Sequence, residues 1–393
     1  MFILGENLMR ILMDGNSYNW PVQPHNGAPL PSARFAPPAP VSARAPAVKL
    51  AEALGALDLV ELKLEIDVDV GAVWCFQQHL AGGSFAPRLL NDIRAVQRAL
   101  QDFHRNEPAS AAEVARFLIW ASGKSGIFNL GGDLKYFEHL VTQRDYGRLK
   151  AYALCCIDVC FMNYSALHSP MLVGALVAGD ALGGGMESAL SCDFILAEEQ
   201  AKFGLPEMLY GLFPGMGAYS FLMRRVGQAR AETFILEGNL HSAAELHALQ
   251  LVDRVVAPGA GRFEMDRHLA KLSRRFNATL AMYNARRRSF PIAYQEMADI
   301  AEEWVSVALR LSDTDLRRMQ KLAVAQGNRL RGAEMQNTTL NAARPVMTCA
   351  ATQHGGRKNQ WAVKPGDRRK AAIPYGRCPV RSPRHRYKAV NAK

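Results

Sequence analysis

Twice in this chain, a short apolar segment leads into a glycine turn and then into a segment with helical spacing. The pattern covers residues 114–134 and again residues 171–190. An alternation of buried strands and helices is typical of a parallel sheet that is covered by helices. Such sheets bind ligands at the carboxyl ends of their strands, which is where both glycine turns lie. The sequence therefore predicts an α/β fold with a ligand site at the two turns.

The segments around these repeats are consistent with the same fold. Residues 60–70 alternate apolar and charged side chains, which indicates a strand with one solvated face, and residues 73–76 supply the second strand of a hairpin. Helical spacing is found at residues 86–103 and over most of residues 261–331. A capping box at residues 242–245 predicts the start of a short helix.

These patterns divide the chain into four regions. Residues 1–50 are rich in Pro, Ala, Ser and Asn, and we expect a flexible leader there. Residues 51–258 hold the alternating strands and helices of the core, and residues 259–335 form a C-terminal helical region. Periodicity is lost in residues 336–393, where Pro, Arg and Gly dominate, so we expect a disordered basic tail.

The formal net charge of +11 raises the question of an RNA or membrane partner. Residues 351–393 contain 12 Lys or Arg and one Asp, whereas the other 350 residues contain 35 basic and 35 acidic side chains. The body of the chain is therefore neutral, which argues against nucleic acid as its partner. No apolar run approaches the roughly 20 residues of a membrane-spanning helix, and no signal-peptide pattern begins the chain. We expect a cytoplasmic protein that does not contact a membrane.

The seven cysteines do not indicate a metal site. Cys156 and Cys160 are one helical turn apart, but no further His or Cys lies at ligand spacing near them. Buried, reduced thiols that pack in a core are the expected state, and we expect no metal.

Two glutamates flank the second glycine turn. Glu187 lies near the start of the helix that follows Gly184, and Glu207 comes after a further turn. The amides of Gly132 and Gly184 could hold a carbonyl oxygen and stabilise negative charge on it, while the two carboxylates exchange protons with the neighbouring carbons. Considered singly, each glutamate is better explained as a partner of a helix dipole or as the start of a helix.

Three strings resemble the signatures of the crotonase (enoyl-CoA hydratase/isomerase) superfamily. They are F-N-L-G-G-D at 128–133, A-L-G-G-G-M-E at 181–187, and F-G-L-P-E with L-F-P-G-M-G within 203–217. The resemblance extends over roughly residues 57–335. It implies a crotonase-like spiral of ββα units, a homotrimer, an oxyanion hole made by the amides of Gly132 and Gly184, and catalytic carboxylates at Glu187 and Glu207.

A narrower resemblance connects the chain to the diffusible-signal-factor synthases of Gram-negative bacteria. It is carried by residues 187–199, 204–221 and 236–246, which include the string G-L-P-E-M-L-Y-G-L-F-P-G-M-G-A-Y-S-F. This resemblance implies dehydration of a 3-hydroxyacyl chain to a cis-2-enoyl chain, followed by thioester hydrolysis that releases a fatty-acid quorum-sensing signal.

The same resemblance implies the partners of the chain. The substrate would be carried by acyl carrier protein or CoA, no cofactor would be needed, and a sensor protein could bind the enzyme. Leu205, Met208 and Trp304 would line the acyl-binding site, although packing between helices explains Trp304 equally well.

Two alternatives remain open at this point. One is an enoyl-CoA hydratase/isomerase of fatty-acid oxidation. The other is a non-catalytic crotonase-like protein that binds RNA through its tail or holds a signalling partner.

Overall fold

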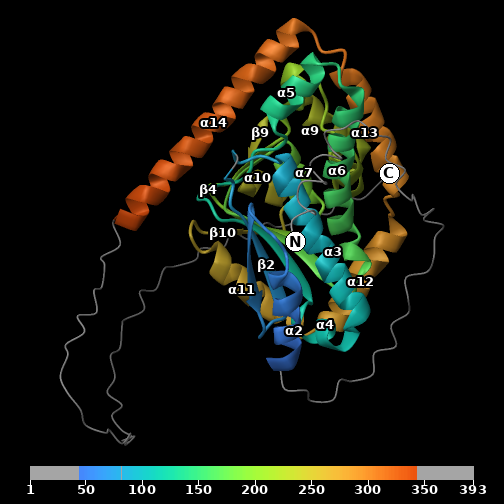
Figure 1. The fold of residues 1–393 in the computed structure, drawn as a ribbon, viewed down its shortest axis with the longest axis vertical. Coiled ribbons are helices and arrows are strands. Elements are labelled where there is room, and N and C mark those ends of the chain that lie inside the picture. Colours follow the sequence, from blue (N-terminus) through green and yellow to red (C-terminus); the bar gives the residue numbers. More distant parts are fainter. Residues whose placement is uncertain (1–43, 81, 343–393) are drawn as a thin grey trace, which may run out of the picture. The chain divides into compact units, whose positions relative to one another are not determined.

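The computed structural model of the protein describes residues 44–80 and 82–342. This part contains two sheets with helices packed around them (Figure 1). The larger sheet has six strands in the order β1-β2-β3-β5-β7-β10. Their bounds are β1 (Leu62–Asp67), β2 (Ala72–Gln77), β3 (Phe117–Ser122), β5 (Leu172–Val177), β7 (Phe194–Glu198) and β10 (Arg254–Val256). The β1–β2 hairpin is antiparallel and the other pairs are parallel, which confirms the predicted α/β fold and its hairpin.

The smaller sheet positions both glycine turns. Its order is β4-β6-β8-β9, with bounds β4 (Gly126–Asn129), β6 (Gly179–Leu182), β8 (Lys202–Gly204) and β9 (Leu240–Ser242). The parallel strands β4, β6 and β8 all end on the same side, and each is followed by one part of the predicted site. These strands have only three or four residues each, which is too short for a period-two pattern to show in the sequence.

Helices cover both faces of the larger sheet. On one face, Leu118 and Trp120 of β3 pack in the same hydrophobic cluster as α3 (Pro87–Asn106) and α6 (Tyr146–Tyr164). On the other face, Phe117 and Ile119 pack with α11 (Gly261–Ser273) and α12 (Phe276–Ser289). Alternate residues of one strand therefore belong to two different cores, which is why the central strands are apolar at nearly every position.

The remaining helices are mostly short. They are α2 (Arg44–Gly55), α4 (Pro108–Val114), α5 (Leu134–Thr142), α7 (Gly184–Leu190), α8 (Ala218–Val226), α9 (Gln228–Glu237), α10 (Ala243–Ala248), α13 (Tyr294–Ala308) and α14 (Asp313–Ala342), with 3-10 turns η1 (Ala166–His168) and η2 (Pro206–Tyr210). The predicted capping box is confirmed at α10, where the Ser242 hydroxyl and the Glu245 carboxylate each accept from the other residue's backbone amide. None of the helices described is both long and apolar enough to cross a membrane.

Three predicted boundaries are wrong. The leader was expected to extend to residue 50, but α2 begins at Arg44 because Leu50 and Leu54, one helical turn apart, are buried against the core. Val114 ends α4 and does not begin a strand. The helical region continues to Ala342 and does not stop at residue 335, because no proline interrupts α14 before Pro345. The predictions for residues 1–43 and 343–393 fall outside the described residues.

Candidate active site

The two glycine turns touch one another. Gly131 has a φ of +93°, and a Cβ built on it would lie 2.8 Å from the carbonyl oxygen of Leu182 and 3.1 Å from the amide nitrogen of Gly184. Only a residue without a side chain fits between the two backbones at this point. The structure thus places the turn that contains Gly132 directly beside the turn that contains Gly184.

The second turn begins α7. Gly183 precedes the helix with a φ of +52° and offers no side chain to cap its first amides. The N–H groups at the start of a helix have no acceptor within the helix, so the amide of Gly184 is available to a ligand.

Glu187 is buried in α7 with a relative exposure of 1%. Its Oε1 accepts hydrogen bonds from the amides of Met216 at 2.7 Å and Ala218 at 2.9 Å. The amide of Met216 belongs to the loop that joins η2 to α8, and the amide of Ala218 begins α8 directly after Gly217, which takes a φ of +114°. Burial raises the pKa of Glu187 to about 7, while the amide hydrogen bonds favour its ionised form and oppose that rise.

Glu207 lies in η2 and is also buried. Its Oε1 lies against Gly183, whereas its Oε2 has no hydrogen-bond partner among the described residues. Burial raises the pKa of Glu207 well above its usual range, and the negative charge of Glu187 raises it further. The structure therefore brings the two glutamates together, although they are on different elements of the chain. Two neighbouring buried carboxylates do not both ionise readily, so the pair holds its last proton more tightly than an isolated carboxyl group does.

Tyr210 is a buried residue near the two glutamates that the sequence did not single out. It follows Glu207 by three residues in a 3-10 turn, and side chains at this spacing lie on the same face. Burial raises the pKa of the Tyr210 hydroxyl, and the charges of Glu207 and Glu187 raise it further, so the phenol lies within electrostatic range of both carboxylates. The three-residue spacing was visible in the sequence, but it marks a shared face only once a 3-10 turn is known there.

The three residues predicted to bind the acyl chain lie in different environments. Leu205 is fully buried in the main hydrophobic cluster, whereas Met208 is exposed. Trp304 is half-buried and packs on the loop that holds Glu187: a Cβ at Gly215 would be 2.6 Å from its ring. Trp304 also contacts Phe137, with ring centroids 5.0 Å apart. Its packing role is thus visible, and acyl binding by these three residues stays a prediction.

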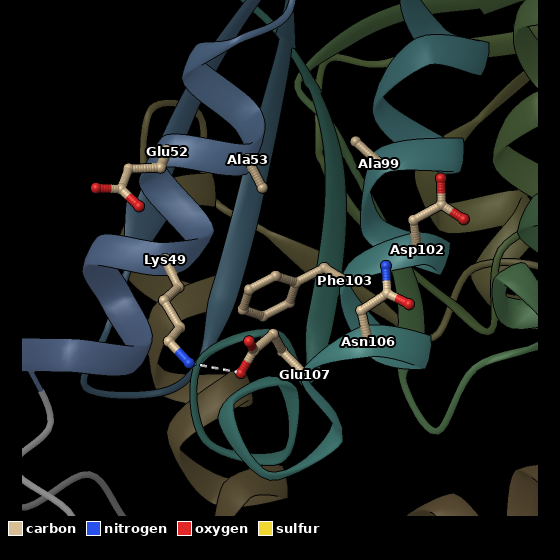
Figure 2. Close-up of a pocket in the computed structure, with 8 residues that line it drawn as sticks. All are labelled: Lys49, Glu52, Ala53, Ala99, Asp102, Phe103, Asn106 and Glu107. Carbon is tan, nitrogen blue, oxygen red and sulfur yellow. Dashed lines mark hydrogen bonds and ion pairs between the residues drawn. The ribbon is translucent and has the colours of Figure 1, made fainter.

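A separate hollow of about 400 Å³ lies between α2 and the end of α3 (Figure 2). Lys49 reaches across it to pair with Glu107 at 2.8 Å. None of the predicted site residues lines this hollow. Across the described residues, no group of three or more His, Cys, Asp or Glu is placed to hold a metal ion.

Comparisons with known proteins point to one family. Residues 99–291 match the enoyl-CoA hydratase/isomerase family. The chain is 38% identical over 172 residues to a probable enoyl-CoA hydratase of Rhizobium meliloti, covering 44% of this chain and 63% of that protein. It is 48% identical over 178 residues to a probable enoyl-CoA hydratase of Mycobacterium leprae, covering 42% of this chain and 63% of that protein. The chain thus spans somewhat less than two thirds of the length of these relatives.

A solved structure has the same fold. The enoyl-CoA hydratase from Bacillus halodurans superimposes with a TM-score of 0.56 at 20% identity, over 67% of this chain and 100% of that chain. The family match contains both glycine turns and both glutamates. Residues 99–291 of this chain are therefore similar to the enoyl-CoA hydratase/isomerase family of the crotonase superfamily.

Proposed function

We propose that this protein interconverts 3-hydroxyacyl and 2-enoyl thioesters by removing or adding water. The observation that carries the proposal is the pair formed by Glu187 and Glu207 beside two glycine turns. Both side chains are buried, but Glu187 accepts two backbone hydrogen bonds that stabilise its ionised form, whereas Oε2 of Glu207 has no hydrogen-bond partner among the described residues. One carboxylate and one carboxylic acid are the two groups that a coupled proton transfer at adjacent carbons requires.

The different surroundings assign a role to each glutamate. In the hydration direction, the Glu187 carboxylate takes a proton from water while the water oxygen forms a bond to C3. The Glu207 carboxyl group gives its proton to C2. Dehydration reverses both transfers, and the hydroxyl group leaves C3 as water. The pair holds one proton before and after the reaction. Adding or removing water changes no net oxidation state of the substrate, so no redox cofactor is needed.

The glycine turns would hold the thioester oxygen. The carbonyl oxygen gains negative charge when C2 becomes part of an enolate, and the amides of Gly132 and Gly184 would donate hydrogen bonds to it. Donors of this kind each contribute about 3 to 4 kcal/mol to stabilising such a charge in well-studied enzymes.

We further propose that the product is a free cis-2-enoic acid that serves as a quorum-sensing signal. The support is the resemblance of residues 187–199, 204–221 and 236–246 to the diffusible-signal-factor synthases. In the second step, water would add to the thioester carbonyl carbon and the C–S bond would break, giving the acid and the thiol of acyl carrier protein. Acyl carrier protein and a sensor protein are the partners that this proposal includes, and the cytoplasm is its location.

A homotrimer is part of the same proposal. The described surface exposes apolar side chains on neighbouring segments η2, α9 and β9, namely Leu209, Leu236 and Leu240. Exposed apolar side chains that gather in one region favour association. Light scattering on the purified protein would measure the oligomer, and a monomer at micromolar concentration would contradict this proposal.

Product analysis tests the function directly. The full chain is incubated with 3-hydroxydodecanoyl-acyl carrier protein and, separately, with crotonyl-CoA, and free acids and thioesters are quantified. Release of the cis-2 acid supports signal synthesis, whereas reversible hydration of crotonyl-CoA alone indicates the fatty-acid-oxidation enzyme. Wild-type protein with neither activity would rule out the enzymatic proposal.

Variants of the chain test the non-catalytic alternative. Glu187→Ala and Glu207→Ala should abolish signal production in cells if the protein is an enzyme. Full biological function in both variants, together with its loss on deletion of residues 345–393, would instead favour a binding protein that acts through its tail.

A further inference from the structure

Of three consecutive amides in the first glycine turn, the outer two donate to side chains and the middle one has no partner among the described residues. The N–H of Gly131 donates to Oδ1 of Asn129 at 2.8 Å, and the N–H of Asp133 donates to the hydroxyl of Tyr152 at 3.0 Å. Within the described residues, no acceptor is found for the N–H of Gly132, which lies between them. Two side chains therefore satisfy the flanking amides and leave the middle one free.

The side chain of Asn129 is fixed in one orientation. It is fully buried, and its Nδ2 donates to Oε1 of Gln77 at 2.8 Å. Gln77 is itself 2% exposed at the end of β2. With its amide nitrogen held by Gln77, Asn129 presents its oxygen to Gly131. A register shift between Ile127 and Asn129 in the β4–β6 pairing accompanies this placement, as is common next to functional sites.

Tyr152 holds the other end of the turn from helix α6. Its hydroxyl donates to the carbonyl oxygen of Phe85 at 2.8 Å while it accepts from Asp133. Phe85 is in turn bound to the glycine turn, since its N–H donates to the carbonyl oxygen of Gly131 at 2.7 Å. A Cβ built on Gly132 would lie 3.5 Å from the Tyr152 hydroxyl, so the phenol packs directly against this residue.

We propose that Asn129 and Tyr152 are positioning residues that aim the amide of Gly132 at the thioester oxygen of the substrate. This inference rests on the proposed function. Each side chain fixes the peptide on one side of Gly132, and an oxyanion donor acts only if it is held in place before the reaction. In this proposal, Asn129 and Tyr152 do not touch the substrate, and each acts by holding the peptide next to Gly132.

A matched pair of tyrosine variants separates positioning from simple stabilisation. Tyr152→Phe removes the hydroxyl group between Asp133 and Phe85. Tyr164→Phe removes a hydroxyl group of the same helix that likewise bridges an amide, of Ile292 at 3.0 Å, and a carbonyl, of Phe290 at 3.2 Å. Tyr164 contacts neither glycine turn through these bonds, so its variant controls for the loss of a hydroxyl group that joins an amide to a carbonyl.

The kinetic result expected is a fall in kcat without a matching change in KM. Supporting residues of this kind typically contribute about 10- to 100-fold. We therefore expect kcat of crotonyl-CoA hydration to fall by about that factor in Tyr152→Phe and in Asn129→Ala, with KM changed by no more than about twofold. Tyr164→Phe should keep the wild-type kcat.

The conservative variant Asn129→Asp supplies a rescue. A neutral aspartic acid at this position can accept from Gly131 through its carbonyl oxygen and donate to Gln77 through its hydroxyl group. We expect it to recover most of the activity lost in Asn129→Ala at pH values where the buried acid stays protonated. A variant whose activity equals that of Asn129→Ala throughout the pH range would contradict the role of the Gly131 hydrogen bond.

Hydrogen exchange measures the positioning without any activity. In the wild-type protein, the amides of Gly131 and Asp133 should exchange more slowly than that of Gly132, and Tyr152→Phe should lose the protection at Asp133. An active wild type whose Tyr152→Phe variant keeps full kcat would overturn the inference and leave the proposed function intact. A wild-type protein that is inactive on every thioester would overturn the proposed function. The role of Asn129 and Tyr152 toward a substrate would then fall as well, even if the amides of Gly131 and Asp133 are protected from hydrogen exchange.

Discussion

The carboxylate of Glu207 lies directly against the backbone of Gly183: a Cβ added to Gly183 would be 2.5 Å from Oε1 of Glu207. Gly183 is also the residue whose φ of +52° turns the chain from β6 into α7. One glycine therefore precedes the Gly184 amide and also contacts the Glu207 carboxylate. The positions of the proposed oxyanion donor and of the proposed acid are coupled through this single contact.

Gly183→Ala should disable the site. The new methyl group would displace the Glu207 carboxylate, and the left-handed backbone is unfavourable for alanine. We expect kcat for crotonyl-CoA hydration to fall by at least about 100-fold, which is comparable to the loss of one oxyanion donor. Gly227→Ala is the matched control, because Gly227 also has a positive φ, of 82°, but has no atom within 4 Å of its Cβ position. Equal losses of activity in the two variants would contradict the contact between Gly183 and Glu207.

The rate of hydration should depend on pH in a bell shape. Glu187 must be ionised to accept a proton from water, and burial raises its pKa to about 7. Glu207 must be protonated, and both burial and the Glu187 charge raise its pKa. We expect kcat/KM of crotonyl-CoA hydration to rise with an apparent pKa near 7 and to fall again at higher pH as the pair loses its last proton. A profile that stays flat from about pH 5 to pH 9 would exclude this acid–base pair.

The stability of the protein should fall as pH rises through the same range. Because burial raises the pKa of Glu187 from 4.5 to about 7, the folded state binds a proton more tightly than the unfolded state does. The stabilisation is fully present below the unfolded pKa and is lost as pH rises through the folded pKa. Glu187→Gln lacks this proton but can still accept the two backbone hydrogen bonds. Urea unfolding at about pH 5 and pH 7 should show a larger decrease in the unfolding free energy for the wild type, by about 2 kcal/mol. Equal decreases of the unfolding free energy in the wild type and in Glu187→Gln would contradict the raised pKa of Glu187.

Local patterns in the sequence were sufficient to predict the fold class and the glycine turns and glutamates of the candidate site. The hairpin formed by β1 and β2 leaves a period-two pattern, and α3 leaves a helical one. Gly131 and Gly183 stand where the backbone takes a positive φ, which glycine adopts without strain. Features of this kind depend on neighbours within a few residues, so they can be recognised without knowing the rest of the structure.

Contacts between distant residues could not be predicted in this way. Asn129 and Gln77 are 52 positions apart, and Tyr152 and Phe85 are 67 apart. A single polar residue in an apolar segment has no periodic signature that indicates its partner. The same limit explains why β8 and β9 were missed, since three residues are too few to show a period and pairing with other strands defines them. The sequence likewise does not show that Glu187 and Glu207 lie close together, because their proximity depends on how the chain folds.

The ion pair between Arg287 and Asp193 should be essential for stability. Asp193 is buried beside β7, and both of its carboxylate oxygens accept from the Arg287 guanidinium, at 2.5 and 2.6 Å. Burial raises the pKa of Asp193, while Arg287 and Arg286 lower it by favouring the charged form. Arg287→Ala would leave this carboxylate with the half-exposed Arg286 as its remaining ion-pair partner among the described residues.

Removing one partner of a buried ion pair typically destabilises a protein by about 3 to 5 kcal/mol. We expect Arg287→Ala to lower the unfolding free energy by close to that amount, and Arg288→Ala, at an exposed position of the same helix, to change it by less than about 0.5 kcal/mol. Urea unfolding of both variants at neutral pH measures the difference. Because Arg287 joins α12 to β7 and also donates to the carbonyl oxygen of Tyr164 at the end of α6, its loss should loosen both sides of the larger sheet together. An Arg287→Ala protein as stable as Arg288→Ala would show that Asp193 is adequately compensated by its other hydrogen bonds, to Val173 and Arg286.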